Sequence, residues 1–318
     1  MSRSGYYAWV VAIPDRARRE AEDQADFKLI LIAYNKRGYT KGARGIYMCL
    51  LHMDPPIVMN LKKIRRLMNK YHLYYPVRRG NPYRQMQKAI KTRNYADNLL
   101  MREFECYGPR MVLLTDITYI PYNGVFAYLS VILDAFTKKI LSYVLSESLE
   151  VDFVKETVEL LVKNHEIDLH KETIIHSDQG AHYTSIAFIR ILKDSKIRQS
   201  MSRRGKCWDN APQETFFGHM KDHLMERIEG AKKFHQIQVA VDDYMDYYNN
   251  ERYVGDLAYL SLNEYYKFVT TGKYPLDISN PPKPPVIERN QRNLGKRKIL
   301  MQSNLLMINV VKKGSSIN

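Results

Sequence analysis

Residues 173–185, TIIHSDQGAHYTS, join a short apolar run to a carboxylate, and this junction decides the fold prediction. Ile174 and Ile175 are typical of the end of a buried strand, and Asp178 follows within three residues. Asp178 could cap the helix expected to follow, or it could form an ordinary turn with Gly180. A third possibility is a metal-binding carboxylate held at the tip of a rigid strand. The rest of the chain has to decide between these three readings.

The positive charge of the chain points to a polyanionic partner. Lysine and arginine total 49 against 34 for aspartate and glutamate, a net charge of +15, and nucleic acid is the commonest such partner. Residues 61–93 hold eleven lysines and arginines and no acidic residue, with tyrosines and a histidine between them. Basic side chains contact phosphates and flat rings stack on bases, so this segment is predicted to bind nucleic acid. The alternative is a merely basic protein with no such partner.

Length and composition indicate a protein with a sizeable core and no membrane span. A length of 318 residues suggests two or three domains. The hydrophobic content of 45% is enough for a real core. No run of eighteen apolar residues occurs, and no signal peptide is expected at the N-terminus. Cys49, Cys106 and Cys207 lie too far apart for a zinc site or a disulfide framework. We therefore expect a protein of a reducing, cytoplasmic setting.

Residues 1–73 are predicted to form a small helical module that binds DNA. Its last helix follows Asn60, a suitable N-cap, and carries apolar residues on one face. The opposite face carries Lys62, Lys63, Arg65 and Arg66. A turn between short helices, followed by a basic helix, is the outline of a helix-turn-helix module. A basic face exposed only to water remains the alternative.

The rest of the chain divides into three parts by composition. Residues 74–107 are predicted to be a basic linker, because proline and glycine interrupt them. Residues 108–270 alternate strand and helix patterns and are predicted to form the main α/β domain with its C-terminal helices. Residues 271–318 are rich in proline and basic residues, and we expect a flexible tail.

The α/β region predicts a mixed five-stranded sheet with flanking helices. Residues 111–148 contain three strand patterns with turns at 121–124 and 135–139, so an antiparallel meander is expected. Asp134 immediately precedes the second turn and is interpreted as a turn residue. After a helix, the strand that ends near Asp178 is expected to return beside the first strand, and a further helix and a short strand follow.

Three carboxylates occupy distinctive positions in this region. Asp116 interrupts the apolar strand VLLTDITYI, Asp178 ends a neighbouring strand, and Glu214 lies near the start of a helix. Thirty-five residues separate Asp178 from Glu214. A carboxylate in a buried strand is costly unless a cation compensates it. Two Mg²⁺ ions about 3.5–4 Å apart would do so and could promote phosphodiester transfer.

Several ordered motifs resemble the catalytic core of bacterial insertion-sequence transposases. They are TDITYI, HSDQGAHYTS and SMSRRGKCWDNAPQETFFGHMK, and the resemblance is to the second-reading-frame product of the insertion-sequence-three family, a relative of retroviral integrases. SRSGYYAW, LKKIRRLMNKYHL and YYNNERYVGDLAYLSLNEYY extend the resemblance over roughly residues 1–270.

The resemblance implies a ribonuclease-H-like fold and a metal-dependent transposase. Asp116, Asp178 and Glu214 are then the catalytic metal ligands, for two Mg²⁺ ions or for Mn²⁺ in their place. The enzyme cuts DNA at the element end, and the exposed 3′ hydroxyl attacks target DNA. The implied partners are element ends, target DNA, further copies of the chain and the upstream-frame product. The implied location is the bacterial cytoplasm, in association with the nucleoid.

Residues around the three acids give secondary predictions. Lys221 lies two helical turns after Glu214 on the same face and could contact phosphate, or could be a solvated lysine. The loop between the last strand and that helix is predicted to contact DNA through Arg203, Arg204 and Trp208. His176 and His182 are interpreted as structural, and Asn210 as a helix cap.

Two departures from the family pattern leave other functions open. The family usually has chain before SRSGYYAW, which predicts a shortened copy, and it usually has proline where Leu262 stands. A catalytically inactive DNA-binding remnant, or a repressor of transposition, is the main alternative. A ribonuclease-H-like nuclease is another, and an RNA–DNA hybrid substrate would distinguish it.

Overall fold

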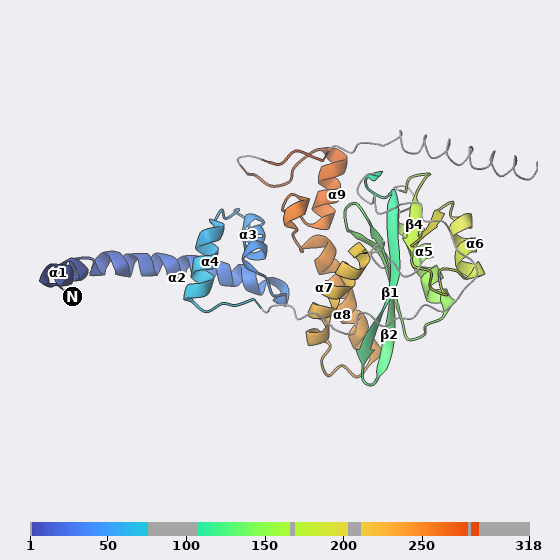
Figure 1. Ribbon diagram of the computed structural model, residues 1–318, viewed down its shortest axis with the longest axis horizontal. Coiled ribbons are helices and arrows are strands. Elements are labelled where there is room, and N and C mark those ends of the chain that lie inside the picture. The colour runs from blue at the N-terminus through green and yellow to red at the C-terminus, as the bar shows by residue number, and fades with distance from the viewer. Residues whose placement is uncertain (1, 76–106, 166–168, 203–210, 279–280, 286–318) are drawn as a thin grey trace, which may run out of the picture.

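The computed structural model describes residues 2–75, 107–165, 169–202, 211–278 and 281–285 (Figure 1). The described N-terminal helices are α1 (Arg3–Val11), α2 (Ile13–Asn35), α3 (Ala43–Leu51) and α4 (Leu61–Lys70). Asn60 caps α4 as expected, since its side chain accepts the Lys62 N–H at 2.8 Å. Across these described segments, none of the helices is both long and apolar enough to cross a membrane. Most of the predicted linker and the tail beyond residue 285 lie outside the described residues.

A five-stranded mixed sheet forms the centre of the α/β region, as predicted. Its strands are β1 (Val112–Tyr122), β2 (Val125–Asp134), β3 (Ile140–Ser146), β4 (Ile174–Ser177) and β5 (Arg198–Met201). They lie in the order β3-β2-β1-β4-β5. The first three form an antiparallel meander, and β4 returns parallel to β1 with β5 parallel beside it. This topology confirms the ribonuclease-H-like integrase core.

Turn chemistry sets both connections of the meander. Asn123 and Gly124 both have positive φ, 43° and 77°, which suits the two-residue turn between β1 and β2. Asp134 is fully buried and accepts N–H bonds from Phe136 and Thr137, both at 3.2 Å. Asp134 is therefore a turn residue, as predicted from its position.

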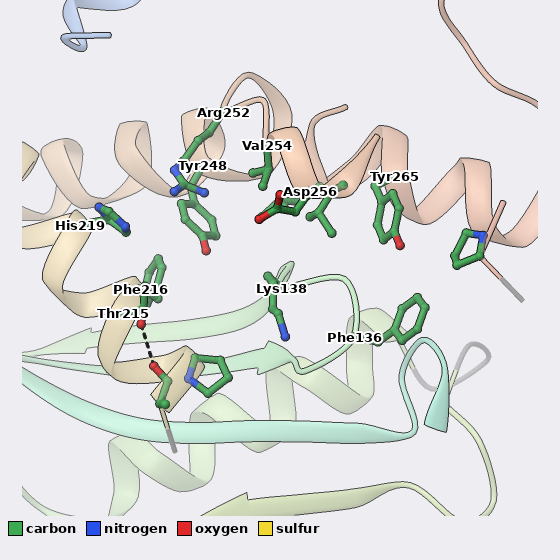
Figure 2. Close-up of a pocket in the computed structure, with 15 residues that line it drawn as sticks. Phe136, Lys138, Thr215, Phe216, His219, Tyr248, Arg252, Val254, Asp256 and Tyr265 are labelled. Atoms are coloured by element: carbon green, nitrogen blue, oxygen red, sulfur yellow. Dashed lines mark hydrogen bonds between the residues drawn. The ribbon is translucent and has the colours of Figure 1, made fainter. Parts of the chain in front are cut away.

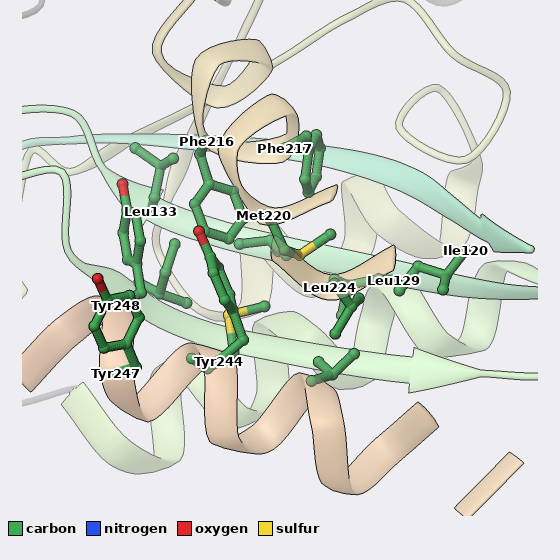
Figure 3. Packing of buried hydrophobic residues seen from close by; sticks show 14 of the residues in the cluster. Ile120, Leu129, Leu133, Phe216, Phe217, Met220, Leu224, Tyr244, Tyr247 and Tyr248 are labelled. Atoms are coloured by element: carbon green, nitrogen blue, oxygen red, sulfur yellow. The ribbon is translucent and has the colours of Figure 1, made fainter. Parts of the chain in front are cut away.

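Helices cover both faces of the sheet. On one face lie α5 (Val151–His165) and α6 (Ile186–Asp194), where Phe153, Val158 and Phe188 are buried against the strands. On the other face lie α7 (Ala211–Arg227) and α8 (Phe234–Asn250), and Figure 3 shows Phe216 and Tyr244 packing there. Burial on both faces explains the continuous apolar runs of the central strands.

The helix α8 also holds the backbone of the edge strand β3. Asn249 Oδ1 accepts the Ile140 N–H at 3.0 Å, and Asn249 Nδ2 donates to the Ile140 carbonyl at 2.9 Å. We expect Asn249→Ala to lower the free energy of unfolding by about 2 kcal/mol, because both buried backbone groups lose their partner. Denaturant titration measures the change, and the exposed Asn250→Ala serves as a control. Equal losses in the two variants would contradict this role.

The N-terminal helices are anchored to α8 through the residues that follow α2. The Arg37 guanidinium lies 2.9 Å from Asp243 and 2.7 Å from Glu251. Tyr39 is 1% exposed, and its ring stacks on Tyr247 with centroids 3.9 Å apart. Tyr39 therefore belongs to the same apolar cluster as the sheet and α7. Figure 1 shows α1 and much of α2 extending away from this anchor.

The last described helix, α9 (Leu262–Thr271), follows its capping residue Ser261.

Candidate active site

The register of the parallel strands brings Asp116 and Asp178 side by side. In the β1–β4 pair, Leu114 lies opposite His176. Continuing this register by two residues sets Asp116 opposite Asp178, which directly follows the end of β4. The structure therefore places two of the three predicted acids next to each other, one within β1 and one just after β4.

Asp178 forms a turn that fixes its own carboxylate. Its Oδ1 accepts the Gly180 N–H at 2.8 Å, so the turn reading of DQG is correct. The capping reading is wrong, because Ser185 caps α6 by accepting the Phe188 N–H at 3.2 Å. A Cβ added at Gly180 would lie 2.9 Å from Asp178 Oδ1. Glycine is therefore needed here to leave room for the carboxylate.

Glu214 reaches the same site from the first turn of α7. The helix is anchored by Phe216 and Met220, which pack against the sheet (Figure 3). The Glu214 carboxylate is close enough to Asp116 to raise its pKa, and the Lys221 ammonium lowers that pKa. Glu214 and Lys221 are predicted to share one face of the helix, and the charges of both affect the pKa of Asp116.

Burial disfavours ionisation of both Asp116 and Asp178, and neighbouring negative charges add to this effect at Asp116. Burial raises the pKa of Asp116, and the charges of Asp178 and Glu214 raise it further. The Ile117 N–H, which donates to Asp116 Oδ1 at 2.8 Å, opposes this shift. Burial raises the pKa of Asp178 as well. The hydrogen bond from the Gly180 N–H and the charge of His182 lower it. A bound cation would relieve this repulsion.

The donor set fits a hard divalent cation such as Mg²⁺ or Mn²⁺ better than a soft metal ion. Asp116, Asp178 and Glu214 offer oxygen ligands only, which Mg²⁺ prefers. In the part of the chain that is described, no three His, Cys, Asp or Glu side chains are arranged as ligands of one ion. Mg²⁺ is commonly held by one or two carboxylates, with water and phosphate oxygens completing its shell. The adjacent pair Asp116 and Asp178 fits that requirement, and the charge of Glu214 also reaches Asp116.

The two histidines near Asp178 have structural partners. His176 is fully buried, and its Nδ1 lies 2.9 Å from the Ser200 hydroxyl on β5. His182 Nε2 donates to the Leu149 carbonyl at 2.8 Å. These contacts agree with the structural interpretation of both residues. Arg203, Arg204, Cys207, Trp208 and Asn210 lie outside the described residues.

The basic face of α4 is only partly available to a ligand. Lys63 pairs with Asp26 of α2, and Arg66 lies 2.6 Å from Asp23 of the same helix. No ion pair joins the exposed Lys62 or Arg65 to another residue in the described segments. The sequence alone did not anticipate these pairs, because the acids lie some forty residues before the basic helix.

Two tyrosines near the acids were not identified from the sequence. Burial raises the pKa values of Tyr119 and Tyr183, and the charges of Asp116 and Asp178 raise them further. Tyr183 is 2% exposed and belongs to the core, whereas Tyr119 on β1 is 37% exposed. Tyr119 follows Asp116 by three residues in TDITYI, and that short spacing is the only sequence signal for it.

A separate cavity of about 790 Å³ opens between α7, the β2–β3 turn and the chain before α9 (Figure 2). Its lining includes Phe136, Lys138, Tyr248 and Arg252, and the Arg252 guanidinium lies 5.1 Å from the centre of the Tyr248 ring. The α7 residues that line it do not include Glu214. The cavity is therefore distinct from the carboxylate site.

Comparison with family models identifies the α/β region. Two models described as an integrase core domain match residues 107–207 and 195–260. The first match contains Asp116 and Asp178, and the second contains Glu214. All three carboxylates thus lie within the matched part of the chain.

Known relatives are proteins of bacterial mobile elements. A protein of Escherichia coli assigned as the transposase InsK of insertion sequence element IS150 is 34% identical over 217 residues, covering 65% of this chain and 71% of that protein. An uncharacterised transposase-like protein of Haemophilus influenzae is 35% identical over 207 residues, covering 64% and 92%. Among solved structures, the HTLV-2 integrase catalytic core in complex with magnesium is similar at a TM-score of 0.40 and 15% identity, covering 50% of this chain and 97% of that one.

Proposed function

Because the chain belongs to the insertion-sequence transposases with an integrase core domain, of the insertion-sequence-three type, we propose that it cleaves DNA at element ends and joins those ends to target DNA. One observation carries this proposal. The β1–β4 register brings Asp116 beside Asp178, and the buried Asp116 carboxylate has its pKa raised further by the charges of Asp178 and of Glu214 on α7. Such crowding is unfavourable without a cation and suits metal-dependent phosphodiester chemistry.

In this proposal Asp116, Asp178 and Glu214 hold two Mg²⁺ ions, which Mn²⁺ can replace. When bound, the metal activates the attacking oxygen and stabilises the leaving oxygen of the phosphodiester. The Gly180 N–H orients the Asp178 carboxylate through its 2.8 Å hydrogen bond. Lys221, which already acts on Asp116, is positioned to offset phosphate charge beside the acids.

DNA binding is proposed to extend beyond the acids. Lys62 and Arg65 on α4 are exposed and would contact backbone phosphates, whereas Lys63 and Arg66 would first have to leave their acidic partners. We also propose phosphate contacts for Arg203 and Arg204, in the segment of sequence that precedes α7. Joining two element ends in one reaction requires at least two copies of the chain, and the upstream-frame product is a further proposed partner.

Strand transfer in vitro tests the proposed function. Wild-type protein and Asp178→Asn are mixed with a duplex of the element's own end, target DNA, and Mg²⁺ or Mn²⁺. We expect the wild type to cleave and join the duplex, and Asp178→Asn to bind it without cleaving. If both proteins bind and neither cleaves, even with the upstream-frame product, the chain is a DNA-binding remnant or repressor. Preferential cleavage of an RNA–DNA hybrid would instead indicate a nuclease.

Gly180→Ala is expected to reduce strand transfer by about 10²-fold with little change in folding. The added Cβ would lie 2.9 Å from Asp178 Oδ1, so the carboxylate must move, and displacements near 1 Å can cost that much activity. Gly255→Ala is the matched control, because its nearest neighbour would be the Tyr259 ring at 4.0 Å. Rates are measured in single turnovers, with melting temperature as the folding check. Equal activity of the two variants would contradict the role of Gly180.

A further inference from the structure

Charge and hydrogen bonding hold the residues just after α2 against α8. The Arg37 guanidinium lies 2.9 Å from Asp243 and 2.7 Å from Asp246, both on α8. It also lies 2.7 Å from Glu251, the residue that follows this helix. The Tyr39 hydroxyl donates to the Asp243 carboxylate at 2.8 Å. One arginine and one tyrosine thus fix the end of α2 on α8 (Figure 1).

The same two residues also contact the C-terminal end of α7. The Arg227 guanidinium, at the last residue of α7, lies 3.9 Å from the centre of the Tyr39 ring and donates to the Arg37 carbonyl at 2.6 Å. The first turn of this helix carries Glu214, about 20 Å away at 1.5 Å of rise per residue. Because Phe216 packs α7 onto the sheet between these ends, one buried helix connects the contact with α2 to the carboxylate site.

The chain between α2 and α7 is held in place along its own length. Lys41 is buried, and its ammonium donates to the carbonyls of Lys36 and Tyr39, both at 2.7 Å. Leaving these carbonyls would strand the charge in a site with little water, so the segment is held in one conformation. A flexible linker would make no such contacts.

A second contact fixes the orientation of the N-terminal helices. His52, directly after α3, stacks on Tyr253 with ring centroids 3.7 Å apart, and its Nε2 lies 3.2 Å from Glu264 of α9. Two separate points of attachment resist rotation, whereas one would permit it. Residues of α2, α3 and α4 share one buried core, so the basic helix α4 has a set place relative to the carboxylates.

We propose that Arg37 and His52 position α4 at a fixed distance from the three carboxylates, so that DNA is cut at one spacing from the sequence that α4 contacts. Both are positioning residues, because neither belongs to the carboxylate site. The partner is duplex DNA of the element end, contacted at two places by one chain. Domain packing is the ordinary explanation of both contacts, and it predicts effects on stability but none on the cut position. The inference rests on the proposed function, since it requires DNA binding by α4 and cleavage at the acids.

End duplexes with inserted base pairs test this fixed spacing. Hydroxyl-radical footprinting without divalent metal first locates the sequence that α4 protects, which Lys62→Ala should expose. One or two base pairs are then inserted between that sequence and the cut site. The wild-type cut should keep its spacing from the protected sequence in every duplex. Arg37→Ala should spread the cuts over neighbouring phosphates and slow the main cut about tenfold, because the reacting groups are misplaced.

Matched variants separate positioning from stability. Arg37→Lys keeps a charge for the α8 acids and should restore the single cut. Arg18→Ala removes an exposed arginine of α2 that pairs only with Asp15 among the described residues, and it should cut like the wild type. His52→Ala removes the second attachment and should also spread the cuts, so it decides if Arg37→Ala does not fold.

Three results would overturn the positioning role. The first is a wild-type cut that stays with the terminal sequence when base pairs are inserted. The second is a single, unshifted cut in folded Arg37→Ala and His52→Ala, even with a lowered melting temperature. The third is equal spreading of the cuts in Arg18→Ala.

The footprints allow this inference and the proposed function to fail separately. In the wild type, the regions protected by α4 and by the carboxylate site should lie at one spacing, which becomes blurred in Arg37→Ala and His52→Ala. If the wild type cuts DNA and neither variant changes the footprints or the cut position, the positioning role is wrong and the proposed function stands. If the footprints blur as expected but the wild type cuts no DNA with metal, the positioning of α4 stands and the proposed enzyme activity is wrong.

Discussion

Asp116→Asn is expected to reduce DNA cleavage and strand transfer by roughly 10³-fold or more, because the metal loses a charged ligand worth several kcal/mol of transition-state stabilisation. The substitution keeps the size of the side chain. The Ile117 N–H can still donate to the remaining side-chain oxygen, so β1 should keep its place in the sheet. Single-turnover cleavage of an end duplex measures the effect, with binding of the same duplex measured in parallel.

The control for this result is an acid outside the site. Asp152→Asn removes a carboxylate on the exposed surface of α5, where it lies 3.0 Å from Lys155. This variant should cleave DNA at the wild-type rate. Retention of activity within about tenfold by Asp116→Asn, in a protein that still binds DNA, would contradict the assignment of Asp116 as a metal ligand.

Asp116→Asn is also expected to make the metal-free protein more stable at pH 8, by on the order of 3 kcal/mol. Burial and the neighbouring carboxylates raise the pKa of Asp116 to about 8, whereas an aspartate in an unfolded chain titrates near pH 3.9. Between these values the folded state retains a proton that the unfolded state releases. Stability contributed by Asp116 is therefore fully present below about pH 4 and is lost as the pH rises through 8.

Urea unfolding in the presence of a chelator, at pH 4.5 and pH 8, measures this difference. The wild type should lose stability relative to Asp116→Asn between the two values, and the two proteins should be nearly equal at the lower pH. Adding Mg²⁺ at pH 8 should stabilise the wild type more than the variant, since the ion compensates the crowded charges. Parallel pH profiles of the two proteins would show that Asp116 is not held in an unfavourable environment.

The proximity of Asp116 and Asp178 could be predicted from the sequence because both carboxylates are conspicuous beside apolar strands. Asp116 interrupts an apolar strand, and Asp178 follows an apolar strand directly. Once the second strand is expected to return beside the first, parallel register places the two carboxylates together, as found. The cap reading of Asp178 failed because Ser185, seven residues later, satisfies the α6 N–H groups instead.

Features that depend on distant residues could not be predicted. The basic residues Lys63 and Arg66 look available in the sequence, but packing of α4 on α2 sets Asp26 and Asp23 against them. Arg37 and its partner Asp243 are about two hundred residues apart, and no local pattern links them. Alternation along β1 also cannot tell that Tyr119 is 37% exposed, because exposure depends on which distant segments cover that part of the sheet.

The central claim is that Asp116, Asp178 and Glu214 together hold the divalent cations used for DNA cleavage. The most direct test is to count bound Mn²⁺ by electron paramagnetic resonance in the presence of the end duplex, for the wild type and for Asp116→Asn. We predict two ions in the wild type and weakened or absent binding in the variant. Equal Mn²⁺ binding by both proteins would place the metal elsewhere and would contradict the account.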